Sequence, residues 1–189
     1  MHTSISVMSF NSQQSFHRRL FADQGSREAN QLLRLLLAQD GSTTRLCEAA
    51  AGGPVSLRVL SQQAHGHVPA VVRLQLPGER FIERITFLAA HGEVLMDNLA
   101  YIALEGLDPA IETVLLAGTL PIGHLLARMW VRREAVADAQ DLPQRLWDAV
   151  GLPDPSATRC YRIVTPEGPR MLIAETYRRG MRMATPPRT

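Results

Sequence analysis

The chain has 189 residues, 46% of them hydrophobic, which suits one domain with a real core, and no apolar run approaches the roughly 20 residues of a membrane span. Its 20 basic and 18 acidic residues leave a net charge of +2, too even a balance to indicate a nucleic-acid-binding protein. Two cysteines, Cys47 and Cys160, make neither a disulfide framework nor a zinc pattern, so we expect small core residues in a reducing, cytoplasmic setting.

The first quarter of the chain predicts an arm, a helix and a pair of strands. Residues 1–25 are rich in Ser, Gln and His and lack the apolar run of a signal peptide, so we expect a flexible N-terminal arm. Ser26 is positioned to cap a helix over residues 27–38, which carries an apolar stripe at helical spacing. After a polar turn, residues 44–49 and 55–62 read as strands around a Gly-Gly-Pro turn.

Alternating apolar residues through the middle of the chain predict a long antiparallel hairpin. A strand over residues 71–76 is followed by strands over 80–89 and 94–103, which the tight turn His91-Gly92 joins. Asp108 and Pro109 then open a helix that ends at Gly118. The remaining predicted elements are a short helix over 122–128, a strand over 131–138, a helix over 142–150, and strands over 158–165 and 170–177.

The last two strands close the predicted sheet as a second hairpin. Strands clustered in antiparallel hairpins, with helices at the start and in the middle, imply an α+β domain rather than a parallel, doubly wound sheet. We expect this single domain to span residues 26–178, with residues 179–189 as a C-terminal tail.

One carboxylate stands out in the final predicted strand. Met171, Ile173, Glu175 and Tyr177 share one face, and three of these four side chains are large and mainly apolar, so we expect Glu175 to lie in a dry wall. A buried carboxylate without a cation has a raised pKa, which suits a general acid or base near neutral pH. The alternatives are a glutamate at the rim of the strand or one half of a structural ion pair.

Two further features are candidates for binding an anion. Arg84 lies within a predicted strand, where it either extends to solvent or points into a cavity and binds a carboxylate with both prongs. The start of the short helix leaves the backbone N–H groups of Ile122 and Gly123 available to an anion, unless this segment is an ordinary packing corner. The pair His65 and His67 has no third ligand nearby, so we predict no metal site.

Taken in order, several segments resemble the chorismate pyruvate-lyase (4-hydroxybenzoate synthase) family. The resemblance covers residues 27–178 and is greatest to the branch that supplies secondary metabolites and cell-wall lipids rather than ubiquinone. The segments that carry it are Asp40-Gly-Ser-Thr-Thr-Arg45, Glu83-Arg84, Leu120-Pro-Ile-Gly123, Tyr161-Arg-Ile-Val and Ala174-Glu175.

The resemblance implies a fold and a set of site residues. The family fold is one antiparallel sheet of about six strands, with helices and two helix–turn flaps over a buried ligand site. By this resemblance Arg84 and the backbone N–H of Ile122, beside Gly123, hold the ring carboxylate, and Glu175 faces the ring hydroxyl. The segment that lines the pocket after the first helix corresponds to Thr43, Thr44 and Arg45.

The resemblance also implies a carbon–oxygen lyase that needs neither a cofactor nor a metal. Such an enzyme eliminates enolpyruvate from chorismate to give 4-hydroxybenzoate and pyruvate. We expect a monomer or weak homodimer that binds a small molecule and neither nucleic acid nor membrane. A chorismate relative as substrate remains an alternative, as does a non-catalytic sensor of aromatic acids. In sensors of this fold, a winged-helix DNA-binding domain normally comes before the sensor domain, and we expect the residues before the first helix to be too few for one. A sensor would need Arg84 to bind its ligand but would not need Glu175.

Overall fold

The computed structural model describes residues 17–21, 27–65, 67–118, 121–127, 129–137 and 139–183. Its centre is one six-stranded sheet in the order β1-β2-β3-β6-β5-β4, in which every neighbouring pair is antiparallel. The predicted α+β class with a single antiparallel sheet is therefore confirmed. The strands are β1 Ser56–His65, β2 Phe81–Ala90, β3 Glu93–Ala103, β4 Arg132–Ala135, β5 Thr158–Thr165 and β6 Gly168–Tyr177.

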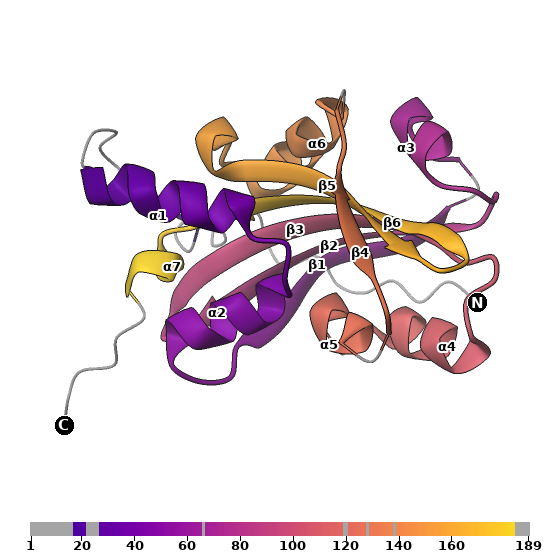
Figure 1. The fold of residues 1–189 in the computed structure, drawn as a ribbon, viewed down its shortest axis with the longest axis horizontal. Coiled ribbons are helices and arrows are strands. Elements are labelled where there is room, and N and C mark those ends of the chain that lie inside the picture. The colour runs from indigo at the N-terminus through magenta and orange to yellow at the C-terminus, as the bar shows by residue number, and fades with distance from the viewer. Residues whose placement is uncertain are drawn as a thin grey trace.

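Helices cover both faces of this sheet (Figure 1), with α3 and α6 on one side and α2, α4 and α5 on the other. None of the helices in the described ranges has the length and apolar character to cross a membrane. The helices are α1 Arg27–Ala38, α2 Thr43–Ala51, α3 Ala70–Gln75, α4 Pro109–Ala117, α5 Ile122–Leu126, α6 Asp141–Val150 and α7 Gly180–Met183, with a 3-10 helix, η2, at Pro155–Ala157.

The alternation of side chains along β6 separates the two cores. Leu172 and Ala174 pack under α3 and α6, whereas Met171 and Ile173 face α4 and α5 on the other side of the sheet. Tyr177, on the same side as Met171, belongs to the core under α1, α2 and α7. Because both faces are covered, the face that carries Glu175 points into the protein, as its apolar neighbours predict.

Two predicted strands are helices. Residues 44–49 belong to α2, because Ser42 caps its first turn by accepting a hydrogen bond from the Arg45 N–H, and Gly52, at φ 68°, ends it. Residues 71–75 of the other predicted strand fall in α3, whose Val72 is fully buried in the same core as residues of α6. In both cases end signals or packing outweigh the β-branched residues of the segment.

The other predicted elements are confirmed with small changes of boundary. The first helix has the predicted bounds, although its predicted cap, Ser26, lies outside the described residues. The two hairpins are β2–β3 and β5–β6. The strand predicted over 131–138 is shorter, at Arg132–Ala135, and the helix predicted over 122–128 is Ile122–Leu126.

Parts of both chain ends pack on the domain. Residues 17–21 fall in the predicted arm, yet Leu20 is fully buried and His17 Nδ1 lies 2.9 Å from Asp97 Oδ1. Arg178 Nε donates to the other oxygen of Asp97 at 2.5 Å, and both side chains are completely buried. In the predicted tail, α7 buries Met181. Residues 1–16, 22–26 and 184–189 lie outside the described part.

The buried pair of Asp97 and Arg178 yields the first prediction. Replacing Asp97 by Ala leaves a buried guanidinium without its carboxylate, so unfolding should become easier by about 3–5 kcal/mol. Urea denaturation followed by circular dichroism measures this change. The control is Glu93→Ala. Glu93 lies on the same strand as Asp97, and its more exposed pair with Arg18 should contribute under about 1 kcal/mol to the free energy of unfolding. Equal costs for the two variants would contradict the prediction.

Candidate active site

A pocket lies between the sheet and the helices α2 and α5. It encloses about 450 Å³ of space, including its open mouth. All six strands contribute a side chain to its floor, and the start of α2, Pro121 and α5 close it. The polar or charged residues that line it are Thr43, Thr44, Arg84, Thr86, Asn98, Arg133, Tyr161 and Glu175.

Strand register places the polar side chains in rows across the floor. Thr86, Asn98, Glu175 and Arg159 stand directly opposite one another on β2, β3, β6 and β5. Arg84 stands one row away on β2. Two strand spacings separate β2 from β6, which carries Glu175, so the separation across the strands is roughly 10 Å. The two residues therefore mark opposite ends of one pocket.

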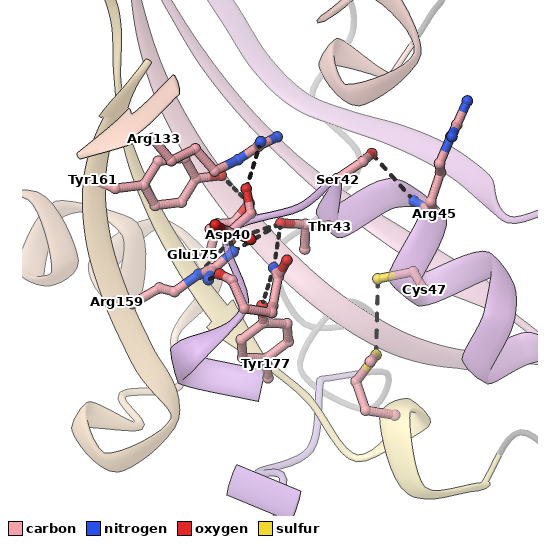
Figure 2. A network of polar contacts seen from close by, with 12 residues as sticks. Asp40, Ser42, Thr43, Arg45, Cys47, Arg133, Arg159, Tyr161, Glu175 and Tyr177 are labelled. Carbon is pink, nitrogen blue, oxygen red and sulfur yellow. Dashed lines mark hydrogen bonds and ion pairs between the residues drawn. The ribbon is translucent and has the colours of Figure 1, made fainter. Parts of the chain in front are cut away.

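Glu175 accepts hydrogen bonds from three side chains (Figure 2) and is only 2% exposed. Tyr161 donates its hydroxyl to Oε1 at 2.6 Å. Thr43 donates to Oε2 at 3.1 Å, and Arg159 donates to the same oxygen from Nε at 3.0 Å and from a terminal nitrogen at 2.9 Å. The expected dry wall without a cation is not what the structure contains, because Arg159 lies beside the carboxylate. The ion-pair alternative describes what the structure contains.

Arg159 is itself held from several sides. It donates to the carbonyl oxygen of Gln39 and, at 3.0 Å, to Thr43, and its guanidinium carbon lies 4.9 Å from the ring centroid of Tyr161. Burial is the largest single influence and opposes its charge, but Glu175 together with Tyr177 and Tyr161 outweighs burial and raises the pKa of Arg159. Burial, together with Glu175, raises the pKa of Tyr161 well above its ordinary value, so this hydroxyl keeps its proton.

Arg84 occupies the other end of the pocket. Its side chain is 1% exposed, and one terminal nitrogen donates to the carbonyl oxygen of Gly118 at 2.9 Å. Burial lowers the pKa of Arg84, which means that its charge is costly in this place. Of the two orientations that the sequence left open, Arg84 points into the cavity.

Six of the seven predicted site residues line this pocket: Arg84, Glu175, Thr43, Thr44, Ile122 and Gly123. Arg45 does not. Because its segment is a helix and not a strand, Arg45 is exposed on α2 and points away from Glu175 (Figure 2), toward a neighbouring shallow pocket. Sequence reasoning assigned no role to Arg159 or Arg133, and it quoted Tyr161 only as part of a motif.

No metal-binding cluster is found in the described ranges. They hold no group of three or more His, Cys, Asp and Glu side chains that is suited to a metal ion. His65, one of the two histidines considered in the sequence, ends β1, and its side chain lies outside the described part of the structure. His124 lies on α5, where its Nε2 is 2.9 Å from a carboxylate oxygen of Glu48.

A known family matches most of the chain. The family model described as "Chorismate pyruvate-lyase Rv2949c-like" matches residues 37–184. A protein named chorismate pyruvate-lyase from Mycobacterium tuberculosis (strain ATCC 25618 / H37Rv) is 27% identical over 175 residues, covering 85% of this chain and 86% of the relative. A protein of the same name from Mycobacterium leprae (strain TN) is 27% identical over 171 residues, covering 85% and 80% respectively.

Similarity to solved structures is weaker. The C-terminal domain of the histidine utilization repressor from Pseudomonas syringae pv. tomato str. DC3000 aligns with 66% of this chain and 91% of its own, at 10% identity and a TM-score of 0.42. A GntR family transcriptional regulator from Bacillus cereus aligns with 71% and 96%, at 10% identity and a TM-score of 0.41. Scores of this size carry no argument about function or site.

The close contact of α5 with α2 yields the second prediction. A Cβ atom on Gly123 would lie 2.2 Å from Thr44 Oγ1 and 2.8 Å from Thr44 Cβ, so Gly123→Ala must separate the two helices that close the pocket. We expect a loss of about 1–3 kcal/mol in the free energy of unfolding, as for other overpacked sites. The control is Gly53→Ala, where a Cβ meets nothing within 4 Å. Urea melts compare the variants, and a Gly123→Ala protein as stable as the control would refute the expectation.

Proposed function

Because this chain belongs to the chorismate pyruvate-lyase Rv2949c-like family, we propose that it eliminates enolpyruvate from chorismate to give 4-hydroxybenzoate and pyruvate. The observation that carries the proposal is one pocket with a buried arginine at one end and a hydrogen-bonded carboxylate at the other. These two groups match the two ends of the product, a carboxylate and a hydroxyl on opposite positions of an aromatic ring.

The reaction itself requires little from an enzyme beyond binding and the handling of one proton. Chorismate carries a ring carboxylate, a hydroxyl on C4 and an enolpyruvyl ether on C3. Loss of the C4 hydrogen as a proton forms the new ring double bond, while the bond from C3 to the ether oxygen breaks and enolpyruvate leaves with that electron pair. The ring becomes aromatic and the enol becomes pyruvate, so atoms and electrons balance without an oxidant.

The side chains of the pocket suit the steps of this elimination. Arg84 binds the ring carboxylate with two N–H groups, which fixes the ring and offsets the cost of burying the guanidinium. Glu175, whose partners all donate to it, accepts the hydrogen bond of the ring hydroxyl and is the base nearest to the C4 proton. The apolar side chains of Leu57, Leu88, Met96, Leu126 and Ile173 keep water from the ring.

The direct test is to mix the purified protein with chorismate. We expect 4-hydroxybenzoate, measured by chromatography, and pyruvate, measured with lactate dehydrogenase, to appear in equal amounts. Tight binding of 4-hydroxybenzoate without turnover would replace the lyase with a sensor of aromatic acids. Turnover of an amino-substituted or isomeric relative alone would retain the reaction type and change the substrate.

The third prediction concerns Arg84. Arg84→Met keeps an apolar chain in the buried position but removes the charge, so 4-hydroxybenzoate should bind more weakly by about 2–5 kcal/mol, the range for truncating one partner of a desolvated charge pair. Isothermal calorimetry measures the change. Arg80→Met is the control, because Arg80 directly precedes β2, its side chain is exposed, and its loss should leave binding unaltered. Affinity equal to that of the wild type would remove Arg84 from the site.

The fourth prediction concerns Glu175. Glu175→Gln keeps the shape of the side chain but loses the base, so kcat should fall by about 10²–10⁴ while 4-hydroxybenzoate still binds. The variant also weakens the pair with Arg159, so its thermal melting point should drop. Turnover is therefore measured at saturating chorismate per folded protein. Glu134→Gln, in a half-buried pair that joins β4 to Arg162 on β5, is the control. A lower melting point with normal kcat would make Glu175 purely structural.

A further inference from the structure

Arg133 is a second cation at the Glu175 end of the pocket. It lies on β4, the edge strand, and lines both the main pocket and the shallow pocket beside it, which also contains Arg45. Its guanidinium carbon lies 5.8 Å from the ring centroid of Tyr161, the residue whose hydroxyl contacts Glu175. Arg133 therefore stands where the two pockets meet.

The guanidinium of Arg133 is anchored but not neutralised. One terminal nitrogen donates to the carbonyl oxygen of Asp40 at 2.9 Å, which directs the group across the Tyr161 ring (Figure 2). Its Nε is buried and makes no hydrogen bond within the described residues. Arg159, on the neighbouring strand, differs because Glu175 occupies its charge. Among the described residues, no carboxylate lies within salt-bridge distance of Arg133.

Chorismate brings a second carboxylate to this end of the pocket. The enolpyruvyl ether sits on C3, next to the C4 hydroxyl, so a ring held by Arg84 at its carboxylate and by Glu175 at its hydroxyl carries the enolpyruvyl group beside Glu175. A carboxylate in a half-buried place requires a cation with directed N–H donors, and a guanidinium offers the best match. Arg133 is the side chain with those donors.

We propose that Arg133 binds the carboxylate of the enolpyruvyl group and so distinguishes the dianionic substrate from the monoanionic aromatic product. This inference rests on the proposed function. Arg84 and Arg133 then hold one carboxylate each, and the bond that breaks lies between the two. The shallow pocket that shares Arg133 with the main one gives the released enolpyruvate a path that does not pass the aromatic product.

Kinetics of Arg133→Gln test the proposal. We expect KM for chorismate to rise by about 10–100-fold, as for loss of one charge-assisted pair, with kcat changed far less and the Kd of 4-hydroxybenzoate within about twofold of wild type. Arg132→Gln is the matched control, because Arg132 precedes Arg133 on the same strand, is exposed and pairs with Glu134. A thermal melt accounts for the lost bond to Asp40.

A binding probe separates this inference from the lyase assignment. The compound 3-(carboxymethoxy)-4-hydroxybenzoate carries the ring carboxylate, hydroxyl and ether carboxylate of chorismate on a ring that is already aromatic. Calorimetry should show that wild type prefers it to 4-hydroxybenzoate and that Arg133→Gln abolishes the preference, whether or not chorismate turns over.

Two outcomes would overturn the proposal. One is an equal effect of Arg133→Gln on both ligands, or on neither, in an enzyme that turns over chorismate, since the lyase would then stand without this subsite. The other is a wild type that shows no preference for the dicarboxylate. Absence of turnover combined with a preference that depends on Arg133 would instead refute the lyase and keep the subsite.

Discussion

Burial of the Glu175 carboxylate is the constraint on which the rest of the site depends. A lone charge in a dry wall is very costly, and here the cost is offset by Arg159 and by two hydroxyl groups from different elements. Because Thr43 begins α2 and Arg159 also donates to the carbonyl of Gln39, the same network ties the segment between α1 and α2 to the sheet. Thr43 and Tyr161 therefore both line the pocket and donate hydrogen bonds to its buried carboxylate.

The same solution recurs for the other buried carboxylates of the sheet. Glu83 pairs with Arg145 from α6, and Asp97 pairs with Arg178. Each pair joins a central strand to a different part of the chain. Arg145 binds both oxygens of Glu83, whereas Arg178 donates to Asp97 through Nε and to the carbonyl oxygen of Leu152 through a terminal nitrogen. Arg84 also lines the pocket, and its guanidinium donates to a backbone carbonyl at the end of α4.

The sequence allowed prediction of the fold and of both ends of the pocket, but not of the cluster around Glu175. The turn at residues 166–167 pairs Thr165 with Gly168, and without interruption it would set Glu175 opposite Thr158 and put Tyr161 on the other face. A bulge between Ile163 and Val164 shifts the register by one residue and sets Glu175 opposite Arg159. Pro169, which cannot donate to the ladder, stands beside that bulge and is the sequence signal that could have indicated it. Arg45 was misplaced for a related reason, because a helix turns successive residues by about 100° where a strand alternates them.

The ion pair changes the chemistry that Glu175 can perform. Hydrogen-bond donors around a carboxylate favour its ionised form, which can act only as a proton acceptor, whereas an isolated buried carboxyl group would keep its proton and could donate it. Tyr161, whose pKa is raised well above its ordinary value, donates its hydroxyl to Glu175 at 2.6 Å from the neighbouring strand. The thiols take no part, since burial raises the pKa of Cys160 to about 11 and that of Cys47 still further. Under the proposed function, removal of the C4 proton falls to Glu175, and the ion pair with Arg159 holds its carboxylate in position.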